Sequence, residues 1–314
     1  ALIVIVSSLV YTLYGGLRAS IFTDNIQFII ILILLLISFI NLISFNFNEF
    51  NFEFIKQNKP DLLSFDYLTN FTAGLTFFIA VAATNLFHQG NWQRVYAAKN
   101  NKVLKKSLIV SFLIIIPIVF FMGFSGLVAV SANSNIVPDL AFFSLLLKEQ
   151  TLMLSVIVII LAISLTISSI DTLINAISSL IVVDGSKVIN FKGDYLKLSK
   201  YFIIFLSIIA FAIASKGLSI LYLFLLADLL CCAAVLTVFY SFYDKKLNEK
   251  NAYLSILIGL LAGLILFPSP DFSKSILIGI LFPVSSFPSF MAQSLLFLSF
   301  LFATFLPIFT WKLK

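Results

Sequence analysis

The sequence contains few charged residues. Asp, Glu, Lys and Arg together make up 11% of its 314 residues, whereas about a quarter of a soluble domain is charged. Apolar residues account for 61% of the chain, and Phe alone occurs 36 times. A soluble chain of this size keeps about a quarter of its surface in water, and this composition cannot supply enough polar groups for that surface. The composition therefore excludes a soluble enzyme and a nucleic-acid-binding domain, and predicts that lipid surrounds most of the chain.

Groups that catalysis or metal binding would require are also scarce. His88 is the only histidine, and Cys231 and Cys232 are adjacent within an apolar run. Adjacent cysteines favour neither a structural disulfide nor a metal site. The sequence has no Gly-x-x-x-x-Gly-Lys-Ser/Thr phosphate loop, no Gly-x-Gly-x-x-Gly fingerprint and no His-Glu-x-x-His pair. We therefore predict a protein that is not an enzyme and that has no cofactor and no resident metal ion.

Long apolar runs dominate the chain instead. A helix needs about 20 apolar residues to cross the hydrocarbon core, whereas barrel strands are shorter and alternate in polarity. The predicted spans are Ala1–Tyr14, Asn25–Ser44, Leu68–Phe87, Ser107–Ser131, Gln150–Ile181, Leu198–Ser215, Leu218–Phe242, Tyr253–Phe267 and Met291–Trp311. Ser275–Phe287 is apolar but short, and is expected to be interfacial or re-entrant. The sequence thus predicts an all-α membrane protein with many spans.

Basic residues are distributed unevenly over the connections between these spans. If Gly15–Asp24 lies inside, thirteen of the 20 Lys and Arg residues fall in inside loops and five in outside loops. Such a bias is typical of cytoplasmic loops. It makes the stretch 45–67, which is rich in Asn and Phe, an extracytoplasmic loop. The net charge of +6 then reflects membrane topology and gives no reason to expect a nucleic-acid partner.

The fifth predicted span carries a polar stripe. Steps of three and four residues place five of its side chains on one helical face: Ser164, Ser168, Asp171, Asn175 and Ser178. A hard monovalent cation such as Na⁺ binds several oxygen ligands of low net charge. The Leu165 carbonyl and the hydroxyls of Ser168 and Ser169 can supply three of them. Alternatively, the small hydroxyl residues allow close helix packing and bond back to their own helix.

Two further polar positions fall inside predicted spans. The third span ends in a polar segment that contains Thr84 and Asn85, and the seventh carries Asp228 at mid-span. Polar groups at membrane depth are costly and often line a solute or ion path. The segment around Thr84 could instead be an ordinary interfacial helix end. Asp228 could instead be a neutral acid hydrogen-bonded to a neighbouring helix.

Three motifs occur in a fixed order along the chain. The first is Tyr11-Thr12-Leu13-Tyr14-Gly15-Gly16-Leu17-Arg18-Ala19, with Thr23-Asp24-Asn25-Ile26-Gln27 after it. The second is Trp92-Gln93-Arg94 with Ala97-Ala98-Lys99, and the third is Ser168–Ser179 with Val183-Asp184. Together they resemble the signature loop, the loop after the sixth core helix and the eighth core helix of the sodium:solute symporter family. In the signature loop, Gly15, Gly16, Thr23, Asp24 and Gln27 carry the resemblance, and the paired glycines are expected to form a tight turn between two spans.

The resemblance implies a fold of two inverted five-helix repeats, as in transporters of the leucine-transporter type. Residues 68–243 would form the complete second repeat and 1–44 the last two helices of the first. Residues 45–67 would connect them, and 244–314 would be accessory spans. The family's sodium ligands on the eighth core helix map to Leu165, Ser168 and Ser169, and its solute contacts map near Thr84 and Asn85. Ligands from the first core helix have no counterpart, so the chain is expected to be an N-terminally truncated piece.

The resemblance implies a secondary active transporter that couples Na⁺ entry to uptake of a small solute across a bacterial-type cytoplasmic membrane. The solute, and the choice between Na⁺ and H⁺, are left open. One alternative is the symporter-like membrane domain of a signalling protein, and another is an inactive truncated transporter. As given, the chain is expected to insert in a membrane without transporting. It is also expected to present an open, polar-lined groove along the fifth span.

Overall fold

The computed structural model describes residues 2–46, 50–132, 136–147, 151–243, 247–270, 272, 275 and 294–310. Within these ranges the regular structure is helical, apart from one isolated bridge between Pro268 and Ser275. The longer α-helices are α1 (Leu2–Asn46), α3 (Leu68–Phe87), α5 (Asn101–Ala132), α7 (Leu152–Ser179), α9 (Tyr195–Ala214), α10 (Ile220–Ser241), α11 (Glu249–Leu266) and α14 (Leu295–Thr310). The shorter ones are α2 (Phe52–Asn58), α4 (Gln89–Ala97), α6 (Ala141–Leu146) and α8 (Gly185–Val188). Two 3₁₀ turns, η2 (Pro60–Leu63) and η3 (Pro138–Leu140), and a π-helical turn, η4 (Leu180–Asp184), complete the set.

Seven helices in the described ranges are long and apolar enough to cross a membrane. This confirms the prediction of an all-α, multi-span membrane protein. Helix α3 has the predicted bounds of the third span. Helix α5 begins at Asn101, earlier than predicted, because the Asn100 side chain accepts a hydrogen bond from the Val103 N–H and caps a polar first turn. The predicted interfacial piece, after Ser275, lies outside the described residues.

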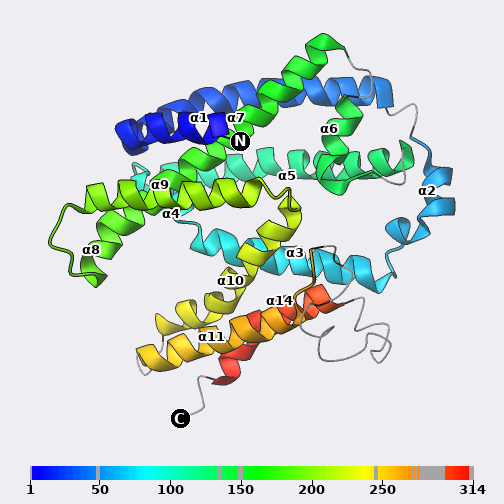
Figure 1. The fold of residues 1–314 in the computed structure, drawn as a ribbon. Coiled ribbons are helices and arrows are strands. Elements are labelled where there is room, and N and C mark those ends of the chain that lie inside the picture. Colours follow the sequence, from blue (N-terminus) through cyan, green and yellow to red (C-terminus); the bar gives the residue numbers. More distant parts are fainter. Residues whose placement is uncertain are drawn as a thin grey trace. The chain divides into compact units, whose positions relative to one another are not determined.

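Helix α1 differs from the prediction of two spans joined by a loop at Gly15–Asp24. Its helical assignment continues unbroken through both glycines, so the predicted loop is wrong. Thr12 and Thr23 nevertheless donate to the same carboxylate, that of Asp171. In a straight helix these residues would lie about 16 Å apart along the axis. The chain therefore reverses direction between them, as the blue ribbon in Figure 1 shows, and paired glycines are a common place for such a kink.

Contacts divide the chain into two units. Unit 1 comprises residues 1–58 and 89–217, and unit 2 comprises 59–88 and 218–314. In unit 1 both arms of α1 pack against α7, which also contacts α4 and α9. An apolar cluster in this unit surrounds Val128, Ala129 and Phe142, and the rings of Phe39 and Phe121 pack beside it at a centroid distance of 4.0 Å and an interplanar angle of 42°. The predicted division into repeats concerns membrane topology and stays a prediction.

Unit 2 packs α3, α10, α11 and α14 around one apolar cluster centred on Leu229, Cys232 and Phe300. Small residues bring α11 and α14 together. A methyl group on Gly259 would lie 2.6 Å from Pro307 Cγ, and one on Gly263 would lie 2.9 Å from Ala303 Cβ. The hydroxyl of Ser299 donates to the Gly263 carbonyl across this crossing at 2.7 Å. Close backbone approach at small residues is the usual way in which membrane helices associate.

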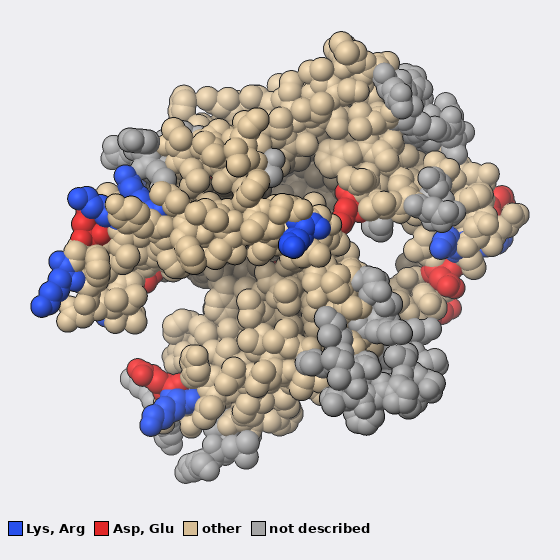
Figure 2. Space-filling model, in the orientation of Figure 1, with Lys and Arg blue, Asp and Glu red and all other residues tan. Residues whose placement is uncertain are grey.

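The outer surfaces of these helices are apolar. None of the most apolar window of α5 is buried within the protein, and Phe112 and Leu113 are each more than 60% exposed. On the face shown in Figure 2, Lys, Arg, Asp and Glu gather in a few small groups and leave most of the surface uncharged. Exposed apolar area of this extent needs lipid as its solvent. The protein is therefore an integral, multi-pass membrane protein.

Candidate functional site

The polar stripe of the fifth predicted span lies on α7. Thr151 is the N-cap residue of this helix, and its Oγ1 accepts a hydrogen bond from the Leu154 N–H. Asp171 and Asn175 are buried, while Ser164, Ser168 and Ser178 are half-buried. Ser178 Oγ lies 3.3 Å from Ser199 Oγ on α9. The stripe thus faces protein, and its neighbours determine what it can do.

Asp171 is fully buried and accepts three side-chain hydrogen bonds. The Thr12 hydroxyl donates to Oδ1 at 3.2 Å, and the Thr23 hydroxyl donates to Oδ2 at 3.3 Å. The Asn175 amide donates to Oδ1 at 2.8 Å from the next turn of α7. A buried carboxylate without such donors would be very costly at membrane depth. Both arms of α1 are therefore held to α7 by a single side chain.

An ion pair lies one turn away. Asp24 Oδ2 contacts Arg94 Nη2 at 2.7 Å, and the Ser168 hydroxyl donates to Asp24 Oδ1 at 3.1 Å. The same guanidinium nitrogen donates to Thr172 Oγ1 at 3.0 Å. The Arg94 side chain is 44% exposed and that of Asp24 20%, so solvent weakens the pair. It connects α1, α4 and α7 through their polar residues.

Helix α4 runs antiparallel to α7 along this site. Gln89 Nε2 donates to Ser179 Oγ at 3.4 Å, and Gln93 Nε2 donates to the Asn175 carbonyl at 3.1 Å. Together with the Arg94–Thr172 bond, these contacts pair later residues of α4 with earlier residues of α7, so the two helices run in opposite directions. The Trp-Gln-Arg segment therefore lies against the polar stripe. All three sequence motifs meet in this part of unit 1.

The three predicted sodium ligands lie within one turn of α7. Ser169 Oγ donates to the Leu165 carbonyl at 3.0 Å, and both residues are exposed. Ser168 Oγ points to Asp24 instead. The donor set consists of oxygens, as a hard cation requires, with a carboxylate beside it. Within the described ranges no cluster of three or more His, Cys, Asp or Glu side chains is arranged for a metal ion, and the assignment of Leu165, Ser168 and Ser169 to Na⁺ stays a prediction.

The remaining signature residues are placed as follows. Gly15 and Gly16 lie in the helical stretch of α1 that joins its two arms. Gln27 follows Asp24 by three residues on the second arm, and its Oε1 is buried without a hydrogen-bond partner among the described residues. Thr23 and Asp24 bind the α7 stripe as described above. Besides its paired glycines, the signature motif therefore contributes Thr23 and Asp24, whose side chains contact α7.

The predicted solute-path residues lie in unit 2. Thr84 on α3 donates to Asp228 Oδ1 on α10 at 2.5 Å. Asn85 is exposed, and its amide donates to the Val81 carbonyl of its own helix at 2.8 Å. The structure therefore brings Thr84 and Asp228 together and directs Asn85 away from them. Asp228 is 0% exposed, so its carboxylate does not face lipid.

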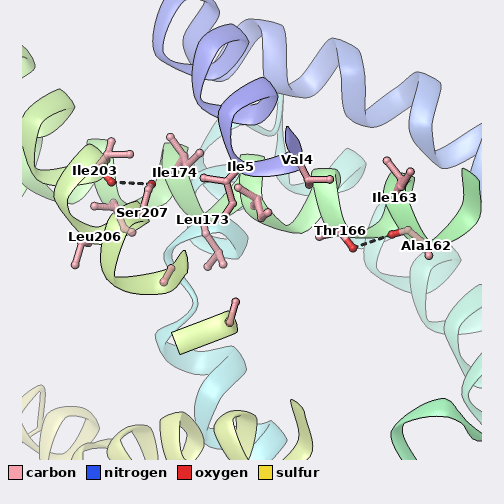
Figure 3. A pocket seen from close by; sticks show the side chains of 14 residues that line it. Val4, Ile5, Ala162, Ile163, Thr166, Leu173, Ile174, Ile203, Leu206 and Ser207 are labelled. Atoms are coloured by element: carbon pink, nitrogen blue, oxygen red, sulfur yellow. Dashed lines mark hydrogen bonds between the residues drawn. The ribbon is translucent and has the colours of Figure 1, made fainter. Parts of the chain in front are cut away.

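An open, polar-lined groove was expected along the fifth span, but the cavity beside this span is lined by other residues of α7 than those of the polar stripe. A cavity of about 530 Å³ lies between the first arm of α1, α7 and α9. Its lining is almost wholly apolar and includes Val4, Ile5 and Ile174. Figure 3 shows its two hydroxyls, on Thr166 and Ser207, bonded to carbonyls of their own helices. The prediction of a polar-lined groove was wrong because α1 and α4 cover the polar face of α7.

Two members of this site were not predicted from the sequence. Thr12 was quoted only as part of a motif, and no partner was expected for Arg94. The signal for Thr12 was present: it is a hydroxyl residue in an apolar arm, just before the glycine pair. The partner of Arg94 could not be found from local sequence, because Asp24 lies far from it along the chain.

Comparison with known proteins supports the likeness that the motifs suggested. Over residues 1–259 the chain matches the sodium:solute symporter family. It is also 29% identical over 154 residues to a spermidine transporter, DUR31, of Candida albicans. That match covers 48% of this chain and 29% of the relative, so the chain spans less than a third of that relative's length. No solved structure matches.

The family match extends over most of the chain. It includes the site formed by α1, α4 and α7 and the greater part of unit 2. The three motifs that meet at this site all lie within the matched residues. The chain belongs to the sodium:solute symporter family.

Proposed function

We propose that this chain is part of a secondary active transporter that couples Na⁺ movement down its gradient to the uptake of a small solute. The contacts among α1, α4 and α7 support the proposal most strongly, because they bring together three sequence motifs that resemble those of the family around one group of oxygens. The Leu165 carbonyl and the Ser168 and Ser169 hydroxyls would contribute three ligands to the ion. The carboxylate of Asp24 beside Ser168 would make the position more attractive to a cation.

Ion binding would act through the conformation of this site. Ser168 Oγ currently donates to Asp24, and as an ion ligand it would turn a lone pair of its hydroxyl toward the ion. Na⁺ would then favour the arrangement of α1 and α7 in which these oxygens converge. A solute that binds better to that arrangement gains affinity when Na⁺ is bound, and Na⁺ gains affinity in return.

The experiment uses Ser168→Ala and Ser169→Ala in proteoliposomes, with sodium-dependent solute uptake as the readout. Each change removes one oxygen of about five and should raise the apparent sodium constant at least tenfold, or about 1.4 kcal/mol. Ser186→Ala is the matched control, because the Ser186 hydroxyl is exposed and donates to the Val183 carbonyl three residues earlier. Unchanged sodium dependence in both variants would reject the assignment.

The name of the matched relative indicates which solutes should be tested first. A relative named as a spermidine transporter makes polyamines the first compounds to test in this assay. Sugars, amino acids and urea follow as the solutes that the family resemblance implies. Uptake that proceeds equally in Na⁺ and in choline medium would remove Na⁺ from the proposal while leaving transport in place.

A further inference from the structure

The buried carboxylate of Asp228 forms a second polar site, separate from the sodium-ligand candidates of unit 1. It lies near the middle of α10 and is 0% exposed. Its Oδ1 accepts the Thr84 hydroxyl at 2.5 Å, a short distance that is typical of a hydroxyl donating to an ionised carboxylate. Its Oδ2 is buried and has no hydrogen-bond partner among the described residues. One half of this carboxylate is therefore satisfied and the other is not.

The described surroundings of Asp228 contain no cation that could neutralise it. Helices α3 and α14, which pack against α10, carry no charged or titratable side chain. Helix α11 carries Glu249, Lys250 and Tyr253, which are exposed at its first turns. On α10 the titratable groups nearest to Asp228 in sequence are the thiols of Cys231 and Cys232, and the phenols of Tyr222 and Tyr240 lie near the two ends of the helix. Only neutral groups in the described structure thus face the carboxylate.

Either protonation state leaves Oδ2 without a partner. The ionised form has an unpaired charge at membrane depth, which costs several kcal/mol. The protonated form has an O–H donor without an acceptor among the described residues, and such an unsatisfied donor is also unfavourable, though less so than a buried charge. A proton removes the charge and needs no cavity, whereas a solute ammonium group or a hydrated ion would need room next to a side chain that is fully enclosed. The geometry therefore favours a proton as the ligand.

We propose that Asp228, with Thr84 as its hydrogen-bond donor, is a proton-binding site of this protein. Proton uptake from water forms an Oδ2–H bond and neutralises the carboxylate, and release restores the charge. Exchange requires a conformation in which α3 and α10 admit water to the pair. The site lies in a different unit from the sodium-ligand candidates and does not depend on the proposed sodium coupling.

Infrared difference spectroscopy of the reconstituted protein tests this site directly. A pH step should change the carbonyl band of a protonated carboxylic acid in the unmodified protein. Asp228→Asn should abolish that band and reduce proton uptake by one proton per chain. Asp66→Asn, which alters an exposed carboxylate of the same unit, is the control and should leave the band unchanged.

Thr84 provides an independent test of the pair. Thr84→Val removes the donor to Oδ1, so the carboxylate loses stabilisation and should hold its proton about tenfold more tightly. Thr84→Ser keeps the hydroxyl and should restore the original titration.

An infrared band that survives Asp228→Asn would overturn the proposal, as would a band that does not change with pH. A band that responds at fixed pH to Na⁺ or spermidine instead would assign the site to that cation and overturn it equally. These readouts require no transport, so a failure of the sodium assay would leave them interpretable.

Discussion

Asp171 offers the sharpest test of the site in unit 1. Its carboxylate accepts from Thr12, Thr23 and Asn175 and is fully buried. A hydrogen bond to a charged group contributes about 1.5–3 kcal/mol. The bond from Thr12, at 3.2 Å, is long for a charged acceptor, so we take the lower end of that range. Thr12→Val keeps the side-chain volume and removes the donor, and should lower the free energy of unfolding by about 1.5 kcal/mol.

Asp171→Asn should be more costly. The amide keeps the shape of the side chain but loses the charge, and its NH₂ group meets hydroxyls that previously donated to an oxygen. We expect a loss of about 3 kcal/mol, which is the scale for breaking a buried charged contact. If the two residues interact as the structure shows, the double variant should be less destabilised than the sum of the single ones by about 1 kcal/mol.

The assay is denaturant or thermal unfolding of the purified protein in detergent, followed by far-ultraviolet circular dichroism. Thr76→Val is the matched control. The hydroxyl of Thr76 is also fully buried but donates to the Thr72 carbonyl of its own helix, in unit 2. Its effect should add to that of Asp171→Asn. If Thr12→Val and Asp171→Asn are additive within about 0.5 kcal/mol, the carboxylate does not hold the first arm of α1.

Two further outcomes are expected. A double-mutant cycle of Asp24→Asn with Arg94→Gln should give a coupling energy of about 0.5–1 kcal/mol that weakens with salt, because the pair is partly exposed. The coupling energy for the more exposed Asp184–Lys187 pair should be near zero. Equal coupling energies for the two pairs would contradict this account. Gly259→Ala should destabilise the α11–α14 crossing by about 1–3 kcal/mol, because its methyl group would overlap Pro307, whereas Gly74→Ala meets open space and should be neutral or stabilising in the same unfolding assay.

Periodicity and length in the sequence were sufficient to predict most of the long helices, but not the short helices α2, α4, α6 and α8. Continuous apolar runs predicted the spans, and α3 has the predicted bounds because polar residues flank both of its ends. The stripe on α7 was also predictable, since steps of three and four residues keep side chains on one face. The assignment failed at Gly15–Asp24, where glycines in an apolar stretch stayed helical although the chain reversed direction.

The partners of the polar residues could not be predicted from the sequence. Ser168 was expected to face an ion, and its hydroxyl instead donates to Asp24. The polar face was expected to line a groove, and both arms of α1 cover it. These contacts join residues that lie between 144 and 159 positions apart, so no local pattern identifies them. Thr84 and Asp228 were each selected separately as costly polar groups at membrane depth, and the structure placed them in contact.

The bonds to Asp171 also determine which parts of unit 1 can move independently. One oxygen holds Thr12 on the first arm of α1 and the other holds Thr23 on the second. Helix α7 cannot rotate about its axis or slide along α1 without breaking at least one of these bonds. A conformational change that preserves both bonds therefore carries α7 and the two arms of α1 as one rigid body. Any motion that opens a path for a solute while these bonds persist has to take place at elements that this carboxylate does not hold.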